Sequence, residues 1–418
     1  MRILMVTPYV PYPPLSGGQV RSYNLIKHLS RNHEITLFCY YRDESEKKSL
    51  TELKKYCQKV EFIKRRPAWS PAHIISAAVT SYPFLLLSTY YSPSLKEKIK
   101  KELSRQTYEL IHCETFYIMP NIPKTSIPIL LVEQTIEYLV YQKFAREFKF
   151  FPFKPFMYLD IWKLKMWEKY YWKKASRLAT MSEDDKRFIN NVFPEVKVDV
   201  IENGVDVAHF DQTKHIKSKN PTVLFVGQFK WLPNMEAAKY LVTDIWPLIK
   251  NKVPDAKLQI VGRNPNQEIL DLGKYPDVTI RSDVEDIRTA FGESDVLLAP
   301  IRNGKGTKLK VLEAMASGTP IVGTHMAAEG IAIENGKHAL IGKNTKELAA
   351  FSSELLKNKE KAQTIAKNAN KLVRETYDWT KIAAKLNQFR KLEMMIVLLQ
   401  SITQILDRTQ IHLTMLGK

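Results

Sequence analysis

The stretch from Ile301 to Gly330 decides the fold and reads IRNGKGTKLKVLEAMASGTPIVGTHMAAEG. Two glycines, Gly304 and Gly306, mark a loop at its start. A helix is predicted from Thr307 to a stop at Gly318, and the Pro-led apolar run 320–323 reads as the next strand. The order is therefore loop, helix and strand, which is typical of an α/β domain.

The predicted helix carries an acidic residue among apolar ones. At 3.6 residues per turn, Glu313 falls inside the stripe formed by Leu309, Leu312 and Ala316. We therefore expect the helix to be largely buried, the carboxylate included. A buried carboxylate needs a hydrogen-bond donor from the protein or a ligand hydroxyl. This stretch alone supports a structural glutamate and a ligand-binding glutamate equally.

Length and composition indicate a soluble globular protein of two or three domains. The chain has 418 residues, of which 44% are hydrophobic and 26% charged. The formal charge of +19 predicts attraction to phosphate-rich partners: nucleic acid, anionic lipid or a negatively charged small substrate. The three cysteines are far apart, so we expect no disulfide and no zinc site in a reduced, cytosolic protein.

The sequence predicts neither a signal peptide nor a membrane-spanning helix. The first residues contain too many prolines and too short an apolar run for a leader. The nearest approach to a span, residues 73–91, is interrupted by Thr80, Ser81 and Pro83. We expect it to be a buried or interfacial segment.

The first half alternates apolar runs with helical patterns, which predicts an open parallel sheet. The predicted strands are residues 2–6, 34–40, 60–63, 110–114, 129–132, 177–181 and 198–201. Gly17 and Gly18 precede a helix at 19–30, an arrangement that binds anions, although a Gly-Gly pair is more often a plain turn. His112 and Glu114 share one face near a strand end, where ligands of such sheets bind. The residue nearer the strand end is expected to reach the site.

Residues 138–178 combine ten Lys or Arg with aromatic residues threaded between them. This composition favours the headgroup layer of an anionic membrane. Two alternatives remain at this point: aromatics that form core beneath a wet basic face, and stacking on single-stranded nucleic acid.

A turn at Glu202–Asp206 and a Lys-rich stretch mark a domain boundary, after which the alternation restarts. The predicted strands are 222–226, 257–261, 278–280 and 296–299, and the predicted helices include 235–248, 287–291, 345–356 and 359–377. Gly227 and Gly262 each follow a strand directly, with Gln228 and Lys230 or Arg263 beside them. Together with the opening loop they suggest one phosphate- and nucleotide-binding crevice.

These features resemble the family 4 glycosyltransferases of GT-B fold, in particular the branch of bacterial surface polysaccharide synthesis. The resemblance covers about 380 residues and rests on specific segments: MRILMVTPYVPYPPLSGGQVR, MSEDDKRFI, VIENGVDVAHF, FVGQFKWLPNMEA and APIRNGKGTKLKVLEAMASGTPIVGTHMAAEGI. It implies two Rossmann-like domains with parallel sheets facing across a cleft. An acceptor-binding domain would comprise residues 1–205 and a nucleotide-sugar-binding domain 206–379, with a C-terminal helix at about 380–418 packing back on the first.

The resemblance also implies the activity and the partners. The reaction is transfer of a sugar from a nucleotide diphosphate sugar to a glycan or lipid-linked acceptor, with retention of configuration and without an obligatory metal or other cofactor. Such an enzyme would be cytoplasmic and peripheral on the inner face of the cell membrane, held there by 138–178, with no nucleic acid as partner.

Roles at single positions follow from the same resemblance. Glu313 corresponds to the second acid of the family's E-x7-E motif, which binds the donor ribose. The diphosphate would be held by amides around Gly306, Thr307 and Leu309 and by the cation of Lys308. The remaining donor-binding positions are Gly17, Gly18, Gly227, Gln228, Lys230, Gly262 and Arg263, and the catalytic candidates are Glu114, His112 and Lys308.

Two departures from the family pattern leave alternatives. Lys305 replaces the first acid of E-x7-E, and the family's strand-end histidine falls nearest Glu114. Gln134 likewise occupies a place where relatives carry histidine. The alternatives are a non-catalytic nucleotide-sugar-binding protein on the same scaffold and a nucleotide-sugar epimerase.

Overall fold

The computed structural model of the chain consists of two compact units. The first contains Met1–Ile201 and the described residues from Ala383 onward, and the second contains Glu202–Ile382. The structure describes residues 1–67, 77, 80–84, 86–148, 150–216, 219–282, 284–304 and 306–388. Lys305 and the C-terminal segment 393–418 therefore lie outside the described residues.

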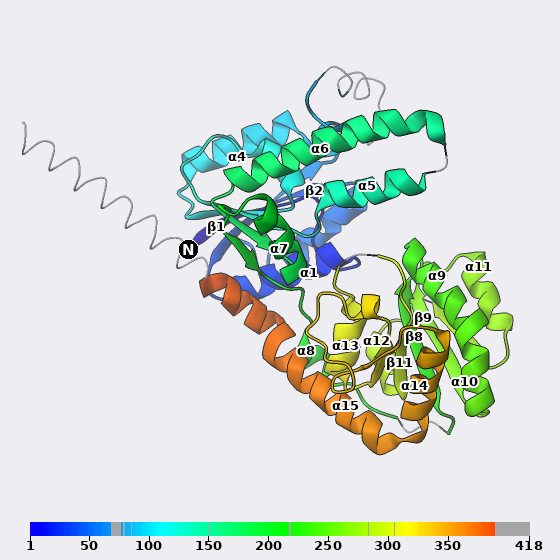
Figure 1. Cartoon of the computed structure of the whole chain (residues 1–418). Coiled ribbons are helices and arrows are strands. Elements are labelled where there is room, and N and C mark those ends of the chain that lie inside the picture. Colours follow the sequence, from blue (N-terminus) through cyan, green and yellow to red (C-terminus); the bar gives the residue numbers. More distant parts are fainter. Residues whose placement is uncertain are drawn as a thin grey trace, which may run out of the picture. The chain divides into compact units, whose positions relative to one another are not determined.

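A seven-stranded parallel sheet forms the centre of the first unit, in the order β3-β2-β1-β4-β5-β6-β7 (Figure 1). Its strands are β1 (Arg2–Thr7), β2 (Glu34–Tyr41), β3 (Lys59–Lys64), β4 (Leu110–Glu114), β5 (Ile129–Glu133), β6 (Arg177–Thr180) and β7 (Val198–Val200). The central strands β1, β4 and β5 are apolar and almost completely buried, because helices cover both faces of the sheet. The strand order changes direction between β1 and β4, which makes their carboxyl ends the switch point where ligands of such sheets bind.

Helices connect these strands. The α-helices are α1 (Gly17–Leu29), α2 (Leu50–Leu53), α4 (Pro93–Arg105), α5 (Glu137–Glu147), α6 (Lys154–Lys174) and α7 (Glu183–Val192). Short turns of other helix types are η1 (Glu44–Ser49), η2 (Leu86–Tyr90), η3 (Phe116–Asn121) and η4 (Phe151–Phe153). Side chains fix several starts: Ser92 accepts the Leu95 N–H at α4, and Ser182 accepts the Asp185 N–H at α7.

Helices α5 and α6 pack side by side and are joined by buried carboxylates (Figure 1). The Glu168 side chain on α6 accepts the backbone N–H groups of Glu137 and Tyr138 at 2.8 and 3.1 Å, so it caps the start of α5. Glu133 at the end of β5 accepts the indole N–H of Trp172 at 2.9 Å. Burial raises the pKa of Glu168 to about 8; it also raises the pKa of Glu133 well above its usual value, and the charge of Glu168 adds to that shift.

The second unit has a six-stranded parallel sheet in the order β10-β9-β8-β11-β12-β13. Its strands are β8 (Thr222–Gln228), β9 (Lys257–Arg263), β10 (Val278–Ser282), β11 (Val296–Ala299), β12 (Ile321–Gly323) and β13 (Leu340–Ile341). The direction of the strand order changes between β8 and β11, so this sheet has its own switch point.

The helices of the second unit pack on this sheet around one large hydrophobic core. They are α8 (Val207–Phe210), α9 (Leu232–Tyr240), α10 (Trp246–Lys252), α11 (Gln267–Leu270), α12 (Ile287–Gly292), α13 (Leu309–Ser317), α14 (Thr345–Lys357) and α15 (Lys359–Leu372), with turns η5 (Leu241–Ile245), η6 (Asp271–Lys274), η7 (His325–Ala327) and η8 (Val373–Tyr377). Gly318 adopts φ +72° directly after α13, the left-handed conformation that favours glycine at a helix end.

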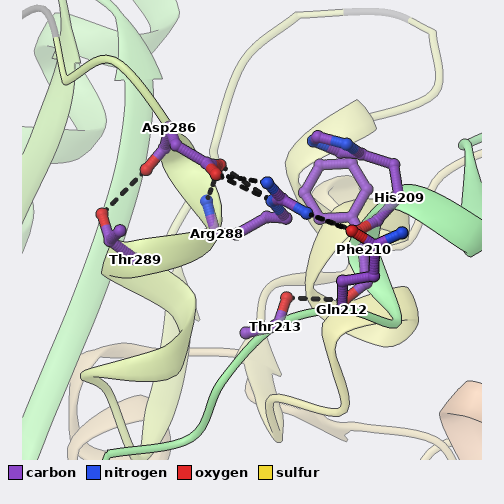
Figure 2. Close-up of polar contacts among 7 residues, drawn as sticks. All are labelled: His209, Phe210, Gln212, Thr213, Asp286, Arg288 and Thr289. Carbon is purple, nitrogen blue, oxygen red and sulfur yellow. Dashed lines mark hydrogen bonds and ion pairs between the residues drawn. The ribbon is translucent and has the colours of Figure 1, made fainter.

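A polar cluster fastens the segment after α8 to the start of α12 (Figure 2). Asp286 caps α12 through the Arg288 N–H and forms an ion pair with the Arg288 guanidinium at 2.6 Å. Arg288 also donates to the backbone carbonyl of His209 and to the Gln212 side chain. Every group named here has a protein partner, so this cluster is structural.

The α/β class predicted from the sequence is confirmed, and the differences concern element ends. The helix expected at 45–56 is the turn η1 followed by the short α2, and the helix expected at 235–248 is broken by the π-helical turn η5. The two-residue strand β13 was not predicted, because two residues give no periodicity.

Candidate active site

Four polar side chains meet at the switch point of the first sheet. Tyr9 follows β1, His112 and Glu114 lie on β4, and Gln134 follows β5. The Gln134 amide donates to the Tyr9 hydroxyl and to Glu114 Oε2, each at 2.8 Å. His112 Nε2 lies 3.0 Å from Glu114 Oε1. These contacts tie three neighbouring strands together at their carboxyl ends.

Glu114 is a fully buried carboxylate that remains ionised. Burial acts to raise its pKa, but the hydrogen bond from His112, the charge of Arg21 and the Gln134 amide together lower it below the usual value. Arg21 on α1 is itself buried, with Nε 3.8 Å from Glu114 Oε2 and a hydrogen bond to the Ile201 carbonyl. Because an ionised carboxylate can only accept hydrogen bonds, the NH2 group of the Gln134 amide, and not its oxygen, faces Glu114.

The structure corrects the expectation that Glu114, the residue nearer the strand end, reaches the site. Both Glu114 and His112 have an exposed fraction of 0%, and their polar atoms face one another. Tyr9 and Gln134 are the partly exposed members of the cluster. A catalytic role for Glu114 or His112 stays a prediction.

The two glycines at the start of α1 differ in their surroundings. A Cβ on Gly18 would lie 2.6 Å from the Tyr9 hydroxyl and 2.9 Å from Gln134 Oε1, whereas a Cβ on Gly17 would have no neighbour within 4 Å. Gly18 therefore allows α1 to approach the polar cluster closely, and Gly17 is the more open of the two.

In the second unit, the loop before α13 has the conformation that its glycines predict. Gly304 and Gly306 adopt φ +105° and +85°, which other residues rarely adopt. The α-helix begins at Leu309, two residues later than predicted, with Thr307 and Lys308 in the approach to it. The Thr307 hydroxyl is buried and has no hydrogen-bond partner in the described part of the chain. A buried hydroxyl without a partner is costly, so this one points to a ligand.

Lys308 is held above the loop. Its ammonium group donates to the carbonyls of Gly304 and Gly306 and lies 3.6 Å from Glu329 Oε2. Burial lowers the pKa of Lys308, while Glu329 opposes the shift. An anionic ligand would further stabilise the buried ammonium group of Lys308, because the carboxylate of Glu329 compensates its charge only in part.

Glu313 lies on α13 one turn beyond Lys310. The helix was predicted to be largely buried together with this carboxylate; most of α13 is buried, and Glu313 itself is half-buried. The surrounding protein nevertheless raises the pKa of Glu313 to about 7 and lowers that of Lys310 to about 7, through desolvation in both cases. Among the described residues none donates a hydrogen bond to the Glu313 carboxylate, whereas Lys310 donates to Asn234 at 2.9 Å.

Gly227 and Gly262 lie within β8 and β9, whereas the sequence analysis placed each of them directly after a strand. They are directly paired across β8 and β9, and a Cβ on Gly262 would lie 1.7 Å from the Gly227 carbonyl oxygen. Glycine is required at 262 because the two backbones approach closely, which is a packing reason and not in itself a binding one.

The polar residues beside these glycines lie at the strand ends. Gln228 closes β8, accepts the Trp231 indole N–H at 3.0 Å through its side chain, and accepts the Asn234 amide through its backbone. Lys230 and Arg263 are both exposed. The donor-binding assignments of all these residues remain predictions.

Three residues of the two clusters were missed from the sequence: Tyr9, Asn234 and Glu329. Each lies in a loop or at a helix start without periodicity, and each is placed by tertiary contacts. None of the three carried a periodic signal, although Tyr9 lies three residues after the predicted strand 2–6, near the sheet edge where ligands bind.

The described residues contain neither a candidate metal site nor a candidate membrane-spanning helix. In that part of the chain, no group of three His, Cys, Asp or Glu side chains is arranged to hold a metal ion. Likewise, none of its helices is long and apolar enough to cross a membrane.

The architecture of the two units matches that of solved structures. The structure resembles Anabaena HepE, solved in complex with UDP and glucose, with a TM-score of 0.61 and 16% identity over 93% of this chain and 99% of the other. Two parallel α/β units with this similarity identify the GT-B fold.

The family follows from sequence comparison. The descriptions "Glycosyltransferase Family 4" and "Glycosyl transferases group 1" match residues 15–209 and 220–358. The chain belongs to the family 4 glycosyltransferases. It is 24% identical to an uncharacterized 44.6 kDa protein in the cps region of Klebsiella pneumoniae, over 91% of this chain and 97% of the relative. It is also 24% identical to the phosphatidyl-myo-inositol mannosyltransferase of Mycolicibacterium smegmatis, over 71% and 74%.

Proposed function

We propose that this glycosyltransferase moves a sugar from a nucleotide diphosphate sugar to a glycan or lipid-linked acceptor, with retention of configuration and without a metal. The observation that carries the proposal is a set of polar groups around the start of α13. The buried Thr307 hydroxyl has no partner in the described part of the chain, Lys308 is a largely buried cation, and no described residue donates to the Glu313 carboxylate. A nucleotide diphosphate supplies the matching groups, which are phosphate oxygens and ribose hydroxyls.

Each group has a defined part in the proposal. Backbone amides between Gly306 and Leu309 and the Thr307 hydroxyl bind diphosphate oxygens, helped by the positive end of the α13 dipole. Lys308 neutralises the charge that develops on the leaving diphosphate, a task that a metal ion performs in other transferases. Glu313 accepts hydrogen bonds from the ribose, which lowers its raised pKa and stabilises its ionised form.

The acceptor class and the cellular process are supported by the relatives. One relative is named for the cps region and another for transfer of mannose to phosphatidyl-myo-inositol. We therefore assign the chain to cell-surface polysaccharide synthesis, with a glycan or lipid-linked acceptor.

The decisive experiment is a panel of nucleotide sugars screened for binding and for slow hydrolysis by the full chain. We expect one nucleotide sugar to be turned over, with turnover unchanged by excess EDTA and abolished by Glu313→Ala. Product analysis by NMR then reports the configuration of the transferred sugar. Binding without turnover would instead identify a non-catalytic nucleotide-sugar-binding protein, and release of an altered nucleotide sugar would identify an epimerase.

A peripheral position on the inner face of the cell membrane is part of the proposal. The support is the stretch 138–178, with its many basic and aromatic residues, together with a lipid-linked acceptor, which would be presented at the membrane. Fractionation of expressing cells checks this location: the chain is expected in the membrane fraction and is released by a wash with high salt. Recovery in the supernatant at low salt would contradict it.

A further inference from the structure

The outer face of α6 exposes an apolar stripe. Leu159, Trp162, Met166 and Tyr170 recur at spacings of three and four residues, which places them along one side of the helix. Their exposed fractions are 51%, 56%, 52% and 47%. Large side chains this exposed and this contiguous mark an interaction surface, because scattered exposed residues would not share one helix face.

The inner face of α6 holds both of the helix's acidic residues. Asp160 accepts the backbone N–H of Phe84 at 2.6 Å, and Glu168 caps α5. Lys163 is buried on this side, where it donates to the carbonyls of Ala77 and Thr80. The basic residues of 138–178 therefore differ in role, and Lys163 stabilises the fold through these two hydrogen bonds.

The charges beside the exposed stripe are positive. Lys165 and Lys169 lie at its margin, with their ammonium groups 5.5 and 5.4 Å from the ring centroids of Tyr138 and Phe193. Lys173 lies near the end of the helix, 4.1 Å from the Phe193 centroid, and pairs with Glu195 at 3.2 Å. Since both acids of α6 point inward, the face offers apolar surface and cations together.

The turn before α6 adds protruding aromatic rings. Phe150, Phe151, Phe153 and Phe156 are 59%, 76%, 58% and 69% exposed, and neighbouring rings in this group lie about 6 Å apart. Aromatic rings that project from a surface in this way insert readily between lipid headgroups.

We propose that the outer face of α6 and the aromatic turn 150–156 form the surface that binds an anionic lipid bilayer, with α6 lying along the membrane plane. The inference rests on the proposed membrane location and names the surface responsible for it. Phe151 and Phe156 enter the boundary between headgroups and acyl chains, while Lys165 and Lys169 contact anionic headgroups.

Charge decides against the other occupants. A second copy of the chain would place the lysines of one α6 opposite those of its partner, without an acid on either outer face. Nucleic acid would satisfy the lysines and stack on the exposed rings, but it would leave the apolar side chains of Leu159 and Met166 uncovered. An anionic bilayer matches both the apolar stripe and the cations.

The test is flotation of the full chain with vesicles of phosphatidylcholine, alone or mixed with phosphatidylglycerol. We expect flotation with the mixed vesicles and its loss in high salt. The double variant Phe151→Ser, Phe156→Ser is expected to lower partitioning by about 10-fold or more. Lys165→Gln and Lys169→Gln are expected to lower it by about 5-fold each.

Matched control variants remove exposed apolar side chains or exposed lysines at positions outside α6 and the aromatic turn. Leu270→Ser with Tyr275→Ser removes two side chains that are each 43% exposed on the second unit, and Lys100→Gln with Lys101→Gln removes two exposed charges from α4. Both control pairs are expected to float like the unaltered chain. Melting temperature and nucleotide-sugar hydrolysis, measured on every preparation, establish that each variant is folded.

Several outcomes would overturn the proposal. One is failure of the unaltered chain to float; another is flotation of the α6 variants to the same extent as the controls. A lipid-free dimer that Phe151→Ser, Phe156→Ser converts to a monomer would identify an interface between copies, and salt-sensitive retention of oligonucleotides lost in the lysine variants would identify a nucleic-acid surface. Hydrolysis without flotation contradicts only this surface, and flotation without hydrolysis contradicts only the proposed activity.

Discussion

The two sheets have switch points of the same topology but opposite polar character. In the first unit the buried ions have protein partners: Glu114 is surrounded by His112, Arg21 and Gln134, and its pKa is lowered. In the second unit, desolvation lowers the pKa of Lys308 and raises that of Glu313. The first arrangement is compensated by the protein itself, whereas we propose that the second is completed by a ligand.

This difference distinguishes residues that stabilise the structure of a site, as in the first unit, from residues that we propose bind the substrate, as in the second. A buried ion with several partners contributes to stability, and its removal leaves those partners uncompensated. A buried ion whose charge the protein compensates only in part lowers the stability of the fold, and such ions are concentrated at functional sites. Substitutions at the two switch points should therefore act on different measurements.

The largest effect is expected from Glu114→Ala, which leaves Arg21 and His112 buried beside an empty space. We expect the free energy of unfolding of the first unit to fall by about 3 to 5 kcal/mol, measured by urea denaturation. Glu114→Gln preserves the shape and should cost less. Unchanged stability in Glu114→Ala would break the comparison, and a loss of turnover in Glu114→Gln beyond its loss of stability would restore a direct catalytic role for Glu114.

The opposite result is expected from Lys308→Met. Turnover of the nucleotide sugar should fall about 100-fold, because charge compensation of the leaving diphosphate is lost. The free energy of unfolding should change by less than about 1 kcal/mol, since a desolvated cation is removed. Lys357→Met, an exposed position on α14, is the matched control and should leave both quantities unchanged. Equal turnover in the two variants would show that Lys308 does not meet the diphosphate.

The adjacent glycines of α1 give a smaller, paired effect. Gly18→Ala places a methyl group against the Tyr9 hydroxyl and Gln134 Oε1, and should destabilise the chain by about 1 to 3 kcal/mol. Gly17→Ala meets no neighbour and should be neutral or stabilising by up to about 1 kcal/mol, because it restricts the unfolded chain. Thermal unfolding of both variants checks this, and equal melting temperatures would contradict the close approach at Gly18.

The smallest effect is the pH dependence of the ligand-free chain. Glu313 has a folded pKa of about 7 against an ordinary 4.5, so its contribution to stability falls as pH rises from about 4.5 to 7. Lys310 has a folded pKa of about 7 against 10.5, so its contribution rises with pH between these values. The pair is therefore least favourable near pH 7.

Two variants isolate these contributions. The melting temperature of Glu313→Gln relative to the unaltered chain should increase by about 2 to 4 °C between pH 5 and pH 7. Lys310→Met should show its largest gain at neutral and lower pH, with the gain disappearing toward pH 10. A difference in melting temperature that does not vary with pH would show that neither group is desolvated.

Much of the fold was predictable, because buried parallel strands appear in the sequence as short apolar runs and the loops between elements appear as glycine-containing segments. The apolar runs that became β1, β4 and β8, and the glycine loop before α13, were all visible in the sequence. The extent of β8 and β9 was not, since their continuation through Gly227 and Gly262 depends on contact between two strands.

The candidate site was predictable to the same degree. The Lys308 and Glu313 positions follow from one short segment with a helical period. The burial of Glu114 does not, because its partners Arg21 and Gln134 lie far from it in sequence and only the sheet brings them together. Tyr9 was missed because a single tyrosine in a proline-rich loop has no pattern.

The double cap of Glu168 on α5 has a mechanical consequence. Glu168 holds the first two amides of α5, and Trp172 of the same helix holds Glu133, the residue before Gln134. These hydrogen bonds connect the C-terminal half of α6 to the start of α5 and to the end of β5. A displacement of α6 would therefore be expected to shift the backbone next to Gln134.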